Sequence, residues 1–257
     1  MADAVSLPAA EFSGRRILIT GAAGSIGSAT ARLLAEAGAE LILSGRDAAR
    51  LEKVAADLPG GSATIAVFDL AAADAIPGWI RELAEKGGPL AGIAHTAGIQ
   101  INRALKMMTA EFSDAMLHAN VTSAIMLAKG LRQRDCHAEG ASLVLLSSAA
   151  ARIGGAGNVA YASSKGAIIA AASSIAHELL RDKIRVNCVV PGLVESDMAA
   201  RSRAVTPPES WNAVLAAYPL GIGHPDDVAH GIVYLLSRRS RWITGTDLRI
   251  DGGLSIV

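Results

Sequence analysis

Residues Arg16–Gly27, with the sequence RILITGAAGSIG, decide the fold of this chain. A short apolar run, which is typical of a buried strand, ends at Thr20, and a helical pattern runs from Ser25 to Ala37. Glycines between them permit a tight turn and close approach of the backbone to a ligand. Free N–H groups at a helix start bind phosphate. The stretch therefore predicts a strand, a turn and a helix that hold a dinucleotide pyrophosphate; the alternative is that small residues only let the helix pack closely on a sheet.

The alternation of short apolar runs and longer helical patterns continues along the chain. Further strands are predicted at residues 40–44, 64–68, 90–95, 142–147, 184–190 and 247–251. Further helices are predicted at about residues 47–58, 74–85, 109–118, 121–134, 158–180, 211–217 and 225–237. Continuous apolar strands between helices are typical of a parallel sheet covered on both faces. We therefore expect an α/β fold, with one doubly wound Rossmann domain over residues 1–257 and a seven-stranded, mainly parallel sheet.

Two segments fall outside this alternation. Residues 1–13 are predicted to be a flexible leader. Residues 195–208 are polar and contain prolines, and a loop of that length in a compact domain usually covers or binds a ligand. We therefore predict a substrate-binding loop at about residues 193–220.

Composition excludes several classes of function. The chain has 24 Lys and Arg against 24 Asp and Glu, so no bulk charge attracts nucleic acid or an anionic membrane. The start of the chain lacks the basic and apolar regions of a signal peptide, and no apolar stretch approaches the roughly 20 residues of a membrane span. Cys136 and Cys188 have neither metal-ligand spacing nor the density of a disulfide framework. We expect a cytoplasmic protein with no bound metal and no nucleic-acid or membrane partner.

Tyr161 and Lys165 lie four residues apart at the start of a long alanine-rich helical pattern, so they can share one helix face. An ammonium about 4 Å from a phenolate is worth roughly 4 kcal/mol at an effective dielectric near 20. That attraction lowers the pKa of a tyrosine by up to about three units. The pair therefore predicts a tyrosine that acts as an acid or base near neutral pH; the alternative is a chance aromatic residue with a snorkelling lysine.

The glycine turn and this pair together resemble the short-chain dehydrogenase/reductase family, and in particular its 3-oxoacyl-(acyl-carrier-protein) reductases. Gly21 and Gly27 match the first and third glycines of the family pattern Thr-Gly-x-x-x-Gly-x-Gly. Ser25 stands at the second glycine, and Gly24 lies one place earlier. The resemblance implies that Gly21, Gly24, Ser25, Ile26 and Gly27 bind the cofactor.

The resemblance also implies four catalytic residues: Asn120, Ser148, Tyr161 and Lys165. Ser148 precedes Tyr161 at the spacing typical of the family; its neighbour Ser147 points to the opposite face of a strand. Asn120 matches the family asparagine that supports a proton path to the lysine, and its place between two helical patterns alone would predict a helix cap. Tyr161 and Lys165 are also implied to contact the cofactor.

Residues 95–98, His-Thr-Ala-Gly, resemble the family sequence Asn-Asn-Ala-Gly with both asparagines replaced. The resemblance implies that Ala97 and Gly98 lie against the cofactor. His95 is the last residue of a predicted buried strand, so we expect a hydrogen-bonded core histidine and not an acid or base.

Arg46 follows the second predicted strand and bears on the choice of cofactor. An acidic residue at this place binds the adenosine ribose of NAD, whereas a basic one favours the 2′-phosphate of NADP. We therefore expect NADP(H), with NAD(H) as the alternative if Arg46 only pairs with Asp47 in solvent. The basic residue that many NADP-dependent relatives carry before the middle glycine is absent, because Gly24 stands there. Asp69, with Leu70, is implied to contact adenine, although an aspartate there could simply cap the next turn.

Residues 191–196, Pro-Gly-Leu-Val-Glu-Ser, resemble the family sequence Pro-Gly-x-x-x-Thr. The resemblance implies that this turn covers the nicotinamide through Pro191, Gly192, Val194 and Ser196; otherwise it is an ordinary turn after a strand. The terminal segment at residues 242–253 matches the family's last strand and is expected to be structural.

The substrate is weakly constrained by the sequence. Expected substrate contacts are Ser148, Arg152, Tyr161, Leu193 and Met198. Other candidate walls of a mostly apolar pocket are Ile153, Val159, Val194, Trp211 and Tyr218. Arg152 either meets an anionic group or is solvated.

The expected reaction is NADP(H)-dependent reduction of a ketone or 3-oxoacyl-type carbonyl to a secondary alcohol, or the reverse. An NAD-dependent alcohol or sugar dehydrogenase is the alternative, and a non-catalytic dinucleotide-binding sensor is a more remote one. Small residues at 166–176 would let another helix approach closely, although they could serve only the packing of this helix on the sheet. Relatives pair subunits through this helix and the one before it, so a homotetramer is expected.

Overall fold

The sheet of this protein contains seven parallel strands among the residues that the computed structural model describes, 10–60 and 63–256. The strands are β1 (Arg16–Thr20), β2 (Glu40–Gly45), β3 (Thr64–Val67), β4 (Leu90–His95), β5 (His137–Leu146), β6 (Arg185–Pro191) and β7 (Asp247–Ile250). Their order is β3-β2-β1-β4-β5-β6-β7, and each neighbouring pair is parallel. The order reverses between β1 and β4, which is the place where doubly wound sheets bind ligands. The predicted Rossmann fold is confirmed.

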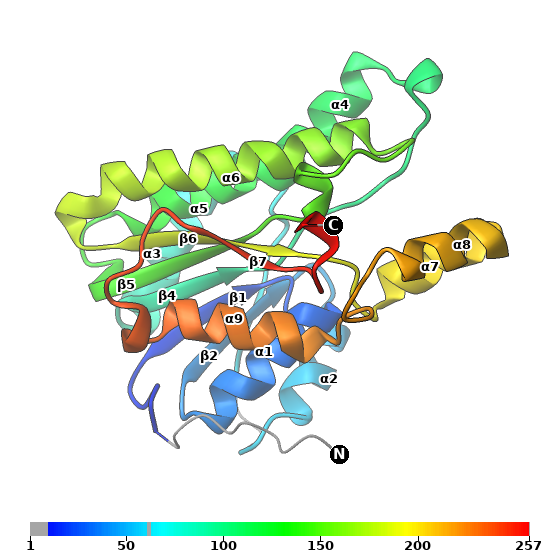
Figure 1. Ribbon diagram of the computed structural model, residues 1–257. Helices are drawn as coiled ribbons and strands as arrows, with labels where there is room; N and C mark the ends of the chain where they lie inside the picture. Colours follow the sequence, from blue (N-terminus) through cyan, green and yellow to red (C-terminus); the bar gives the residue numbers. More distant parts are fainter. Residues whose placement is uncertain (1–9, 61–62, 257) are drawn as a thin grey trace.

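Helices cover both faces of the sheet (Figure 1). One face carries α3 (Ile76–Gly87), α5 (Ser123–Leu131) and α6 (Val159–Leu179), and the other carries α1 (Ser25–Glu36), α2 (Ala48–Ala56) and α9 (Pro225–Leu236). Helix α4 (Ala110–Leu117) packs against α6, and α7 (Asp197–Val205) and α8 (Pro208–Ala216) project from the side of the molecule beside β7. Among the described residues, no helix combines the length and the apolar character needed to cross a membrane.

Alternating side chains of each strand build two separate cores. In β1, Leu18 joins the core under α3, α5 and α6, whereas Ile17 and Ile19 join the core under α1 and α9. All three side chains are fully buried, and each such burial stabilises the fold by about 1.5–3 kcal/mol. The continuous apolar runs in the sequence exist because both faces of every central strand are covered.

The structure differs from the sequence-based expectation at several places. Strand β5 begins at His137, well before the strand predicted at residues 142–147. Most of the predicted leader, residues 1–9, lies outside the described residues, but Phe12 is fully buried and its N–H donates to Ala37 O at 2.9 Å. Helix α7 occupies residues that were expected to form a loop. Asn120 lies in a π-helical turn, His118–Thr122, that joins α4 to α5 without a break, so it is not a helix cap.

Candidate active site

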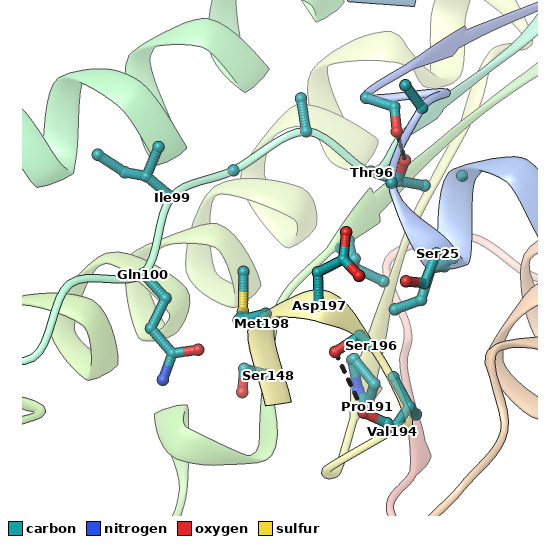
Figure 2. Close-up of a pocket in the computed structure, with 18 of the residues that line it drawn as sticks. Ser25, Thr96, Ile99, Gln100, Ser148, Pro191, Val194, Ser196, Asp197 and Met198 are labelled. Carbon is teal, nitrogen blue, oxygen red and sulfur yellow. Dashed lines mark hydrogen bonds between the residues drawn. The ribbon is translucent and has the colours of Figure 1, made fainter. Parts of the chain in front are cut away.

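A cavity of about 820 Å³ opens at the carboxyl ends of the strands. Its walls come from the segments that follow six strands, β1 to β6, and from Tyr218. Figure 2 shows Ser25, Thr96, Ser148 and Asp197, each from a different segment, around this cavity. All sixteen predicted cofactor residues line it, as do Ser148, Leu193 and Met198.

The glycine turn after β1 forms one end of the cavity. Gly21 has a φ of 71°, and a Cβ there would lie 2.6 Å from Ala97 N. A Cβ on Gly27 would collide with Gly21 O and lie 2.8 Å from Thr96 Oγ1. These two glycines therefore let the turn close against the segment after β4, and α1 then begins at Ser25 with its N–H groups beside the cavity.

Polar side chains at the ends of β1 and β4 hold this turn in place. Thr96 Oγ1 donates to Thr20 O at 2.8 Å, and Thr20 Oγ1 and His95 Nδ1 lie 2.8 Å apart. His95 is 2% exposed, and burial, with a smaller effect of the Lys165 charge, lowers its pKa to about 3. His95 is therefore a neutral core residue, hydrogen-bonded at Nδ1 as expected, but its buried Nε2 has no partner among the described residues. Thr96 takes a supporting role that the sequence did not reveal.

Tyr161 and Lys165, in the first turns of α6, and Ser148, just after β5, line the same cavity. Burial raises the pKa of Tyr161 above its usual value, and a side-chain hydrogen bond with Ser148 opposes part of that rise. The expectation that Lys165 lowers the pKa of this tyrosine is wrong for the structure described here. Lys165 Nζ donates to Leu146 O at 2.8 Å and lies 5.8 Å from the centre of the Tyr161 ring, and burial is the dominant influence on the pKa of Tyr161.

Lys165 is almost fully buried, and burial lowers its pKa to about 8. At pH 7 the ammonium form therefore still predominates, by about tenfold. An ammonium has three N–H donors, and Leu146 O uses one of them. No other partner of this ammonium lies among the described residues, so two donors remain for groups that enter the cavity.

Ser147, which lines the cavity, and Asn120, which lies behind it, support this end. Ser147 Oγ donates to Lys165 O at 2.7 Å, which fixes the helix to the end of β5. Asn120 is 1% exposed; its Oδ1 accepts from Ile99 N at 2.9 Å, and its Nδ2 donates to Ile99 O and to Ser164 Oγ. Asn120 therefore fixes the segment after β4 against α6 and does not line the cavity itself.

The opposite end of the cavity carries charged side chains after β2 and β3. Arg46 lines it, and no ion pair with Asp47 forms among the described residues. Asp47 Oδ1 instead accepts from Arg50 N at 3.1 Å as the cap of α2. Asp69 Oδ1 accepts from Ala71 N at 3.0 Å. Asp69 therefore caps the next turn, which was the alternative interpretation of this residue, and it also lines the cavity.

The segment after β6 closes the cavity from a third side. Leu193 N donates to the hydroxyl of Tyr218 at 2.8 Å, and Val194 pairs with Gly223 in an isolated bridge. Ser196 Oγ donates to Val194 O, drawn as a dashed line in Figure 2, and accepts from Ala199 N as the cap of α7. These contacts place Met198 and Asp197 over the cavity.

Several predicted substrate contacts lie away from the cavity. The Arg152 guanidinium pairs with Asp247 and does not line it. Ile153, Val159 and Trp211 do not line it either. Sequence reasoning missed Ser44, Arg50, Thr96, Gln100 and Asp197, which do. Ser44 and Thr96 could have been identified from their positions at strand ends. No feature of the sequence marks Arg50 or Asp197 as cavity residues.

The residues present fit a nicotinamide dinucleotide. The glycine turn leaves backbone space that a Cβ would fill, and helix α1 presents N–H groups to phosphate there. Ser44 Oγ is buried on the cavity wall without a hydrogen-bond partner within the described part of the chain, which suits a ribose hydroxyl. Fold and cavity together define the class as a dinucleotide-binding oxidoreductase.

Comparison with known proteins gives the same class. Residues 21–255 match a family model described as enoyl-(acyl carrier protein) reductase. The 3-oxoacyl-(acyl-carrier-protein) reductase of Thermotoga maritima is 33% identical over 95% of this chain and 99% of its own length. The protein of the same name from Chlamydia pneumoniae is 30% identical over 94% and 97%. A solved short-chain dehydrogenase/reductase of Brucella melitensis, titled glucose/ribitol dehydrogenase, has a TM-score of 0.87 at 27% identity and covers 97% of this chain and 100% of its own.

The chain belongs to the short-chain dehydrogenase/reductase family and is an NAD(P)-dependent oxidoreductase.

Proposed function

We propose that the protein interconverts a ketone or 3-oxoacyl-type carbonyl compound and a secondary alcohol, with NADP(H) as its preferred cofactor. The observation that carries the proposal is that Ser148, Tyr161 and Lys165 share one cavity with the glycine turn. Relatives named 3-oxoacyl-(acyl-carrier-protein) reductase support the reductive direction. A bound nicotinamide would supply the hydride to the carbonyl carbon, or accept it from the alcohol.

In the reductive direction, Tyr161 donates its hydroxyl proton to the substrate oxygen. Burial keeps this hydroxyl protonated at neutral pH, because it raises the pKa of Tyr161. Ser148, whose side chain opposes part of the rise in the pKa of Tyr161, holds the same substrate oxygen in place. Lys165 uses its free N–H donors to hold the ribose hydroxyls of the cofactor and to stabilise the phenolate that forms. Asn120 supports the return of a proton to this site.

The apolar walls of the substrate end are Leu193 and Met198, beside Tyr218. These side chains suit an apolar chain or ring next to the carbonyl group. Pro191, Gly192, Val194 and Ser196 are proposed to cover the nicotinamide, since they line the cavity between its two ends. The substrate therefore reacts beneath helix α7.

The choice of NADP(H) rests on Arg46. Its guanidinium is exposed on the cavity wall after β2, where it can bind the 2′-phosphate as a planar fork. The carboxylates of Asp47 and Asp69 on the same wall favour the alternative, an NAD-dependent alcohol or sugar dehydrogenase. A relative from Sphingobium indicum, 29% identical, is named 2,5-dichloro-2,5-cyclohexadiene-1,4-diol dehydrogenase.

One panel of assays separates these functions. Purified protein is mixed with NADPH or NADH and a set of ketones and acyl thioesters, and the loss of reduced-nicotinamide absorbance is followed. We expect faster turnover with NADPH, and a Tyr161→Phe variant that binds cofactor but loses turnover. Turnover retained by Tyr161→Phe would refute the proton-transfer role; preference for NADH would refute the assignment of Arg46. Binding of either cofactor without turnover of any substrate would favour a sensor.

We further propose that the protein is a homotetramer and works in the cytoplasm. Helix α6 leaves Ser163, Ala170 and Ser173 exposed, and Ile125 of the preceding helix α5 is 42% exposed. These small and apolar side chains would let matching helices of a second subunit approach closely. Light scattering that finds a monomer at micromolar concentration would contradict the tetramer. Cys136 and Cys188 are buried free thiols, which suits a reducing compartment and is checked by cell fractionation.

A further inference from the structure

A second arginine, Arg50, lines the cavity near Arg46. Arg46 precedes the Asp47 cap of helix α2, and Arg50 lies in the first turn of that helix. Both side chains therefore extend from the N-terminal end of α2, next to the segment after β2. Nothing in the sequence pattern assigns a function to Arg50.

The contacts of Arg50 direct it to the glycine turn. Its Nη2 donates to Ala23 O at 3.0 Å, inside the turn that precedes α1. The same nitrogen lies 4.0 Å from Asp197 Oδ2, at the first residue of α7. Arg50 therefore spans the space between α2, the glycine turn and α7.

The ion pair with Asp197 leaves Arg50 available to a ligand. The two side chains are 59% and 80% exposed, and exposed pairs contribute little stability. A guanidinium has five N–H donors, and one is used by Ala23 O. Asp47 accepts the backbone N–H of Arg50 and not its side chain.

The charges around this end of the cavity require more than one cation to attract a phosphate. Carboxylates of Asp47, Asp69 and Asp197 line the same cavity as Arg46 and Arg50, with Arg201 of α7 as a further guanidinium. A phosphate monoester carries a charge of about −1.5 to −2 at pH 7. Arg46 alone would have to offset the negative charge of these carboxylates and also neutralise the phosphate.

We propose that Arg50 is a second ligand of the cofactor 2′-phosphate, which it binds together with Arg46 while it remains anchored to the glycine turn. This inference rests on the proposed function, because it presupposes that the cavity holds the adenosine end of NADP(H) after β2. Arg50 would then be a further residue that determines cofactor specificity, and it lies in helix α2 and not at the end of β2. Selectivity for NADP(H) then depends on two arginines and not on Arg46 alone.

The test is ligand binding by calorimetry, which needs no substrate. The probes are adenosine 2′,5′-bisphosphate (2′,5′-ADP) and 5′-AMP, which differ only in the 2′-phosphate. The variants are Arg50→Gln, Arg46→Gln and, as a control, Lys53→Gln, which removes an exposed cation of the same helix α2. We expect Arg50→Gln and Arg46→Gln each to weaken binding of 2′,5′-ADP by about tenfold or more. Binding of 5′-AMP should change by less than about threefold in both variants, and Lys53→Gln should change the binding of neither ligand.

The outcomes separate this inference from the proposed function. Unchanged 2′,5′-ADP binding by Arg50→Gln, with the expected loss in Arg46→Gln, would overturn the role of Arg50 and leave the NADP(H) proposal intact. An equal loss of both ligands would also overturn it, since Arg50 would then only support the glycine turn through Ala23. Failure of the unchanged protein to bind either ligand would refute the cofactor site and this inference with it. Retained 5′-AMP binding shows that each variant is folded.

Discussion

Lys165 carries its ammonium group in an almost fully buried place, and replacing it by methionine should stabilise the protein at neutral pH. The residue is 4% exposed, and burial lowers its pKa from 10.5 to about 8. Since one pKa unit corresponds to about 1.4 kcal/mol, keeping this lysine protonated in the folded protein at pH 7 costs about 3 kcal/mol. Methionine has a similar length and no charge, so Lys165→Met removes that cost.

The same substitution removes a hydrogen bond. Lys165 Nζ donates to Leu146 O, and a buried carbonyl that loses its donor costs about 1–3 kcal/mol. The expected net gain in the free energy of unfolding at pH 7 is therefore up to about 2 kcal/mol. Activity should be lost at the same time, because the proposed phenolate loses its cation.

The dependence on pH provides the sharper measurement. Between pH 8 and 10.5 the folded protein releases the Lys165 proton while the unfolded chain still holds it, so the unchanged protein gains stability as pH rises through this window. The advantage of Lys165→Met should shrink by about 2 to 3 kcal/mol between pH 7 and pH 10. The lost hydrogen bond contributes equally at both pH values and cancels.

Urea unfolding followed by circular dichroism, at one fixed protein concentration, measures this difference. The control is Lys53→Met, the same change at an exposed position of α2, which should show no such dependence on pH. A Lys165→Met effect of the same size at pH 7 and pH 10 would refute the reasoning. The ammonium would then not be destabilised by its surroundings.

Two further substitutions test the glycine turn and the segment after β6. Gly21→Ala should destabilise the protein by at least about 2 kcal/mol more than Gly60→Ala and abolish dinucleotide binding, because both glycines have positive φ but only Gly21 faces a backbone atom, Ala97 N, at 2.6 Å. Equal thermal melting curves for the two variants would contradict this. Tyr218→Phe removes the acceptor of Leu193 N and should raise KM several-fold, for a loss of about 1 kcal/mol, with kcat little changed. A fall in kcat at constant KM would exclude a role limited to positioning that segment.

The strands and the glycine turn could be predicted because their signals are local. Each central strand is buried on both faces, so Ile17, Leu18 and Ile19 form one continuous apolar run. The turn needs residues without a side chain at Gly21 and Gly27, and this requirement is visible as glycine in the sequence. These requirements restrict the residue type within a single segment, so they are visible in the sequence.

Helix α7 could not be predicted, because it lacks such a local signal. Ala199 is its one buried residue, so no apolar stripe marks the helix. The sequence does contain a helix cap, Ser196 followed by Asp197. The family resemblance, however, assigns Ser196 to the cofactor. A helix held mainly by its cap and by the turn before it leaves no periodic pattern.

Contacts between distant segments could not be read from the sequence either. Arg50 meets Ala23 and Asp197 because α2, the glycine turn and α7 converge at the carboxyl end of the sheet. Arg152 matched a candidate substrate contact by position, yet its nearest anion is Asp247 of β7. Only the packing of elements decides which cation meets which anion.

The error about Tyr161 follows from the same distinction and bears on mechanism. Sequence spacing correctly puts Tyr161 and Lys165 on one helix, but it cannot say where the ammonium points or how deeply both groups are buried. Burial disfavours the charged form of each, raising the pKa of Tyr161 and lowering that of Lys165. At pH 7 the site therefore holds a neutral phenol beside a lysine that is still charged, which is the state that protonation of a carbonyl oxygen requires. In the proposed reverse reaction Tyr161 must first become a phenolate, which Lys165 can stabilise by directing one of its remaining N–H donors toward the tyrosine while another stays on Leu146 O.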